Sequence, residues 1–122
     1  MCLLKLEVMN EPEGQPHPHI PIFHKIDIVI PYIETVFEIS TMWKLCTNIR
    51  LREAGLVSDK IGVVNYETTR LDFPYFSYRT IQGITHNLIF KDMEVATKAR
   101  ELMLQSVDNF YKNYSQYITT LR

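Results

Sequence analysis

The last third of the chain is a strand that leads directly into a long helix, and this transition constrains the fold more than any other feature. Residues 84–90 alternate as a strand with one buried face does. Asp92 follows, and it is a favourable N-cap because its carboxylate accepts hydrogen bonds from backbone N–H groups that lack helical partners. Apolar side chains then recur every three or four residues, which predicts a helix over residues 92–118 with one apolar stripe. The stripe consists of Ala99, Met103, Val107, Phe110, Tyr114, Tyr117 and Leu121.

The strand over 84–90 is predicted to form a hairpin with a strand over residues 75–81. Gln82 and Gly83 separate the two strands, and glycine provides the positive φ that a tight hairpin turn requires. A two-residue loop would place Tyr78 opposite Asn87 and Phe76 opposite Ile89. Both faces of this hairpin carry bulky groups, so we expect one face to pack on helices and the other to be a candidate surface.

Three further segments are predicted to be strands. Residues 2–9 alternate between apolar and polar side chains, isoleucines share one phase over residues 20–30, and residues 60–68 are rich in β-forming side chains. Between the first two, residues 10–19 contain three prolines and one glycine, which indicates a loop.

The stretch over residues 33–54 is the hardest to assign. Its apolar side chains follow helical spacing, and Gly55 after Ala54 is typical of a helix end, so we favour a helix. However, residues 35–41 are rich in β-branched side chains and also alternate, which leaves residues 33–47 ambiguous between helix and strand.

These elements predict one α+β domain over residues 1–122. We expect an antiparallel sheet of about five strands, with the two helices packed on one of its faces. A chain of 122 residues is the size of a single domain and can bury a core without a metal or a disulfide.

Charge and cysteine content narrow the function classes. Lys and Arg number 13 and Asp and Glu 14, and no segment is strongly basic, whereas extended phosphate binding normally needs a basic stripe. Cys2 and Cys46 lie among apolar residues and are expected to be reduced, buried side chains. No secretory signal or membrane-spanning run is evident, so we expect a cytoplasmic protein with no membrane partner.

Aromatic and arginine side chains alternate around the predicted hairpin. Such side chains serve as anchors at protein interfaces, and on a sheet they also stack bases and neutralise phosphates. Glu67 and Asp72 lie within the same stretch and disfavour phosphate. We therefore predict a surface for a protein partner, with single-stranded nucleic acid as the alternative and ordinary core filling as the simplest explanation. The candidate residues are Tyr66, Arg70, Tyr75, Tyr78 and Arg79.

The end of the long helix is rich in tyrosine. A tyrosine ring is apolar while its hydroxyl tolerates water, which suits an interface. We expect Phe110, Tyr114 and Tyr117 to form a contact between copies of the chain if the helix extends beyond the sheet.

No catalytic motif is present, so an enzyme is not the favoured class and no cofactor is predicted. His17, His19 and His24 could ligate a metal, but their spacing favours a polar loop, and we assign no metal site. His86 near Tyr78 and Arg79 keeps a small hydrolase or nuclease as the third hypothesis.

The ending Phe90-Lys91-Asp92 followed by the helix that begins at Met93 resembles the ends of small phage-encoded or bacterial accessory proteins. The resemblance covers about a quarter of the chain and assigns neither a function nor residue roles, and it only slightly favours a small accessory or inhibitory protein. Our leading hypothesis is a small non-enzymatic interaction or regulatory protein that binds a macromolecular partner, chiefly a protein.

Overall fold

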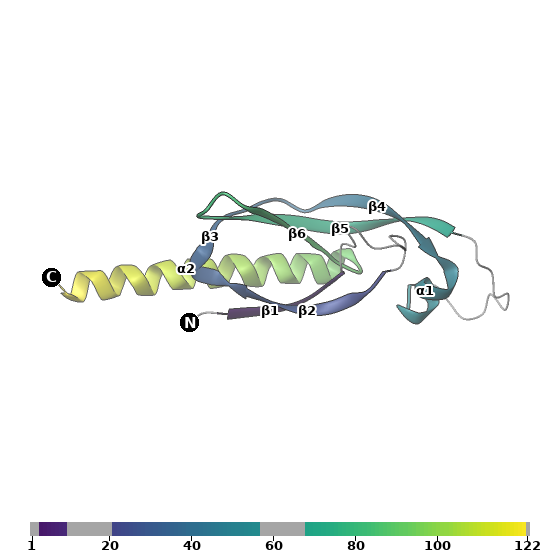
Figure 1. Ribbon diagram of the computed structural model, residues 1–122. Coiled ribbons are helices and arrows are strands. Elements are labelled where there is room, and N and C mark those ends of the chain that lie inside the picture. The colour runs from purple at the N-terminus through teal and green to yellow at the C-terminus, as the bar shows by residue number, and fades with distance from the viewer. Residues whose placement is uncertain (1–2, 10–20, 57–67, 122) are drawn as a thin grey trace.

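The computed structural model describes residues 3–9, 21–56 and 68–121. The fold is α+β, with six strands in one antiparallel sheet and a long C-terminal helix (Figure 1). The described elements are β1 (Leu3–Met9), β2 (Phe23–Val29), the 3-10 turn η1 (Ile30–Tyr32), β3 (Ile33–Val36), β4 (Ser40–Thr47), α1 (Asn48–Glu53), β5 (Thr68–Thr80), β6 (Thr85–Ile89) and α2 (Met93–Leu121). The expected strand over residues 60–68 and the loop over 10–19 lie almost entirely outside the described residues.

The sheet has the order β2-β1-β6-β5-β3, and β4 follows β3 along the same edge of β5. β1 and β6 meet at a single pair, Met9 opposite Ile89. The sheet therefore opens at this point, and Figure 1 shows the β1–β2 ribbon on one side of α2 and the β4–β5–β6 ribbon on the other.

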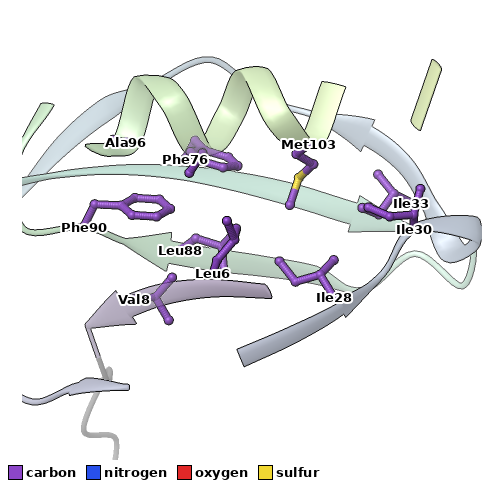
Figure 2. Packing of buried hydrophobic residues seen from close by; sticks show 11 residues of the cluster. Leu6, Val8, Ile28, Ile30, Ile33, Phe76, Leu88, Phe90, Ala96 and Met103 are labelled. Atoms are coloured by element: carbon purple, nitrogen blue, oxygen red, sulfur yellow. The ribbon is translucent and has the colours of Figure 1, made fainter. Parts of the chain in front are cut away.

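The larger hydrophobic cluster, which we call the α2 core, lies between these two ribbons. The apolar stripe of α2 enters it through Ala99 and Met103, as the sequence periodicity predicts, and Ala96 is buried in it as well. Phe76 stacks on Phe90 at 5.3 Å between ring centroids, and Figure 2 shows both rings in the core. The remaining buried members are Leu6, Val8, Ile28, Ile30, Ile33 and Leu88.

A second cluster occupies the opposite face of the sheet. On β5 it takes the odd-numbered Phe73 and Tyr75, whereas the α2 core takes the even-numbered Phe76 and Tyr78. Because alternate residues of a strand point to opposite faces, the two clusters lie on different sides of β5. Leu51 of α1 packs in the second cluster with Met9, Cys46 and Ile89.

The prediction of a helix over residues 33–54 is therefore wrong for residues 33–47, which contain β3, β4 and the connecting residues 37–39. Only six residues, Asn48–Glu53, are helical, and their Leu51 packs in the second cluster rather than the α2 core. The β-branched alternation prevailed over helical spacing because β5 offers a long edge to pair with, and a strand lets Met42 and Cys46 reach the second cluster together. The helix end was placed correctly, because Gly55 has φ of +71° directly after the Ala54 cap.

The β5–β6 hairpin forms as predicted, but its register differs by one residue. Thr80 and Ile84 close a three-residue loop between the strands, because Thr80 N–H donates to the Ile84 carbonyl at 2.9 Å. Within this loop Gly83 N–H donates to the Thr80 carbonyl at 2.9 Å. Tyr78 consequently lies opposite His86 and not Asn87. Gly83 does supply the expected positive φ, at +87°.

Candidate interaction surface

The strongest candidate surface lies where β4 and β5 continue beyond the first turn of α2 (Figure 1). Phe90 N–H donates to the Pro74 carbonyl at 2.9 Å, and α2 begins three residues later. Asp72 and Arg70 precede Pro74 on the same face of β5, so they lie past the start of the helix. The helix that covers Phe76 does not extend over this end of the strand.

Trp43 and Leu45 of β4 lie on this face, opposite Asp72 and Arg70 in the strand register. Their side chains are 55% and 47% exposed, which is unusual for neighbouring large apolar residues on one strand. The Arg70 guanidinium carbon lies 4.7 Å from the centre of the Trp43 ring. We call these four residues the Trp43 edge.

The contact between the Arg70 guanidinium and the Trp43 ring joins β4 and β5 on this surface. A guanidinium over an indole ring is attracted by the ring quadrupole, which contributes about 0.5–1 kcal/mol at an exposed site. Arg70 forms no ion pair with any described residue, although Asp72 is nearby in sequence. The Trp43 edge therefore combines an apolar plate with both a positive and a negative group.

β4 is also an edge strand among the described strands. Its ladder runs over eight residue pairs with β5, from Ser40 opposite Tyr75 to Thr47 opposite Thr68, and no other described strand pairs with it. Exposed edges are usually protected by charges, prolines or bulges. Within Ser40–Thr47 the only charged residue is Lys44, and there is no proline.

The predicted partner-binding residues do not form one surface. Tyr66 lies outside the described residues, and the other four are divided between the two faces of β5. Arg70 and Tyr78 have even numbers, whereas Tyr75 and Arg79 have odd numbers. Arg70 and Arg79 are nine residues apart, which corresponds to about 30 Å along a strand. Of the predicted set, only Arg70 belongs to the Trp43 edge.

The other three residues are engaged by their own chain. Tyr75 packs against the second cluster, and Tyr78 packs against the α2 core with its ring 5.1 Å from that of His86. Burial raises the pKa of the Tyr78 phenol. The Arg79 guanidinium donates to Glu34 Oε1 at 3.1 Å and to Thr35 Oγ1 at 3.3 Å.

The remaining sequence candidates are placed as follows. His24 is exposed on β2 and His86 on β6, whereas His17 and His19 are outside the described residues. Among the described residues, no three His, Cys, Asp or Glu side chains are grouped as metal ligands. Cys46 is 1% exposed, as expected, and burial raises the pKa of its thiol.

The proposed oligomer contact lies on α2. Phe110 is partly buried and packs against the α2 core. Tyr114 and Tyr117 are helical, and their side chains lie outside the description. Figure 1 shows the last turns of α2 projecting past the sheet. Over the described residues, no helix combines the length and hydropathy needed to cross a bilayer.

Sequence reasoning missed Trp43 and Leu45. Under the helical interpretation Trp43 was only one of the side chains at helical spacing and was not singled out as a surface residue. The strand alternative contained the correct signal, because Thr41, Trp43 and Leu45 alternate with Met42, Lys44 and Cys46. If Cys46 is buried, that alternation places Trp43 on the opposite face.

Comparison with known proteins adds no identification: no family model, no curated protein and no solved structure matches this chain. Function is therefore inferred from the geometry of the described residues.

Proposed function

We propose that the protein is a non-enzymatic interaction protein that binds a partner protein at the Trp43 edge. The observation that carries the proposal is the exposure of Trp43 and Leu45 side by side on an edge strand. Trp and Arg are the side chains most enriched among residues that dominate binding energy at protein interfaces. Fully burying such an apolar side chain contributes about 1.5–3 kcal/mol, so a partner that covers both gains substantially.

The occupant that fits this geometry is an extended segment of the partner, added as a strand alongside β4. The free backbone groups of an edge strand give such a segment its hydrogen bonds. Alternate side chains of the added strand would then lie beside Trp43 and Leu45. An acidic side chain among them would form an ion pair with Arg70. On this proposal, backbone hydrogen bonds and burial of Trp43 and Leu45 together supply the affinity, and the Trp43–Arg70 pair adds specificity.

Site-specific photo-crosslinking tests the proposal. A photoreactive phenylalanine derivative at position 45 places the reactive group on the Trp43 edge, and the same group at Lys98, an exposed position on α2, is the matched control. We expect position 45 to capture a specific protein from native lysate that Lys98 does not capture. Introducing Trp43→Ala into the position-45 protein should abolish that product. Identical products from both positions, or products unaffected by Trp43→Ala, would contradict the proposal.

Single-stranded nucleic acid is the second candidate, because an exposed indole on a sheet is also a stacking platform for bases. Asp72 on the same face and the net charge of −1 weigh against it. Trp43 is the only tryptophan in the chain, so its fluorescence reports stacking directly. Quenching by an unlabelled oligonucleotide at low salt, reduced by Arg70→Ala, would replace the protein proposal with this one.

Self-association through α2 is a separate proposal about assembly. It is supported by the projection of the last helical turns beyond the sheet, with the tyrosine-rich sequence in that part (Figure 1). Sedimentation of the parent protein and of Tyr114→Glu should differ, with the variant shifted to monomer. Identical monomer profiles would reject the contact.

A further inference from the structure

A cavity of about 320 Å³ lies away from the Trp43 edge, between the end of β2, η1 and the hairpin end of β5. Its size falls in the lower part of the range typical of small-molecule sites, which is about 300–1,000 Å³. It is lined by Asp27, Ile28, Val29, Tyr32, Tyr78, Thr80 and Gln82.

The charge of this cavity is one-sided. Among the described residues that line the cavity, Asp27 alone carries a formal charge. Lys5 lies opposite Asp27 in the β1–β2 register, but these two described side chains form no ion pair. The Asp27 carboxylate is therefore available to an incoming positive group.

The tyrosines reinforce this preference. Aromatic rings attract cations through their electron-rich faces, and Tyr32 is 51% exposed at the cavity. The ring of Tyr78 stacks on His86 at 5.1 Å, which fixes its orientation, and because burial raises the pKa of Tyr78 its hydroxyl remains a neutral hydrogen-bonding group. Thr80 Oγ1 accepts a hydrogen bond from Ile84 N–H at 3.2 Å, which leaves the hydroxyl hydrogen of Thr80 for a ligand or water.

Other ligand classes fit less well. A metal ion requires several anionic or imidazole ligands, and the described residues contain no such group. An anion would face Asp27 with no countercharge in the lining. We propose that this cavity binds a small organic cation, an amine or quaternary ammonium compound, with Asp27 as the counter-ion and Tyr32 and Tyr78 as aromatic walls.

Titration with choline chloride, followed in amide NMR spectra, tests this site. The control ligand is the uncharged analogue of choline in which carbon replaces the quaternary nitrogen, and sodium chloride matches the ionic strength. We expect saturable shift changes at the amides of the lining residues with choline, and none with the analogue. Equal changes with both ligands, changes located elsewhere, or no saturable change would overturn the assignment.

Variants then test the assigned roles. Asp27→Asn and Tyr32→Ala should each weaken choline binding by about threefold to tenfold, because each removes one attraction for the cation. Trp43→Ala, which alters an exposed aromatic residue outside the cavity, should leave the affinity unchanged. Unchanged affinity in both cavity variants, with amide spectra that show an intact fold, would refute the site. The cavity and the Trp43 edge share no residues, so failure of one proposal leaves the other standing.

Discussion

The two ends of β5 differ in what covers the face that points toward α2. At the Phe76 end this face is closed, because Phe76 is fully buried between Phe90 and the stripe of α2 (Figure 2). At the Arg70 end the same face carries Trp43 and Leu45 on β4, both about half exposed. The strand is continuous, so the difference arises from where the helix begins.

This difference separates stability from recognition. Residues under the helix stabilise the fold because they are buried within the chain. Trp43 and Leu45 are about half exposed, so they contribute less to stability by burial. The exposed apolar area at the Trp43 edge therefore remains accessible to a second molecule. Substitutions at one end of β5 at a time test whether the two ends differ in this way.

The largest effect is expected at the closed end. Phe76→Ala should destabilise the protein by about 3–5 kcal/mol, because it leaves a cavity between Phe90 and Met103 that the surrounding core fills only in part. Urea unfolding followed by circular dichroism measures the change. A loss below about 1 kcal/mol would show that this end is not the principal core.

An intermediate effect is expected where α2 begins. Val95 N–H donates to Asp92 Oδ1 at 2.8 Å, which confirms the predicted N-cap. Asp92→Ala should destabilise the protein by about 1 kcal/mol, whereas Asp92→Asn should retain most of the stability because the amide oxygen can also accept this bond. Equal losses for both variants in urea unfolding would assign the effect to charge near the helix dipole and not to the cap.

A small effect on stability is expected at the open end. Trp43→Ala should lower the free energy of unfolding by about 0.5–1 kcal/mol, because removal of the half-exposed ring eliminates mainly its contact with Arg70. The same urea experiment that reports Phe76→Ala provides the comparison. A loss similar to that of Phe76→Ala would mean that Trp43 is part of a core and not of a docking surface.

Alkaline pH should produce a gradual loss of stability that originates in the closed regions. Burial raises the pKa of Cys46 above its ordinary value of 9.0 and that of Tyr78 above 10.0. The folded state therefore holds these protons more tightly than the unfolded chain, and the resulting stability is complete below the ordinary pKa values and decreases as pH rises through the raised ones. Urea unfolding at about pH 8 and about pH 10 should show this decrease, and Cys46→Ala with Tyr78→Phe should reduce it. An identical decrease in the double variant would exclude these two groups as its source.

Much of the fold was predictable from periodicity. Periods of 3.6 and 2 residues predicted the stripe of α2 and the strands β1, β2 and β6. The Asp92 cap and the β5–β6 hairpin were predicted from local residue types. Residues 33–47 were not resolved by such patterns, because their apolar side chains suit both periods. Pairing with β5, a contact distant in sequence, decided between the alternatives.

The candidate surface was predicted only in part, for the same reason. Arg70 was identified, but Trp43 was not singled out, and Tyr75, Tyr78 and Arg79 were grouped without knowledge of their faces. The hairpin register was predicted with an error of one residue, so Asn87 was expected opposite Tyr78 where the structure has His86. Such groupings therefore depend strongly on the exact register. The local sequence favours a three-residue connection no more clearly than a two-residue one, and the choice became visible only in the paired strands.

Acrylamide quenching measures directly whether the Trp43 edge is open to solvent, since Trp43 is the only tryptophan in the chain. If the face of β5 beyond the start of α2 is open, Trp43 in the isolated folded protein will be quenched readily, and the partner captured at position 45 will protect it. If Trp43 is instead shielded in the isolated protein to the degree expected of a core side chain, the distinction between a closed end and an open end is wrong, and the proposed docking surface fails with it.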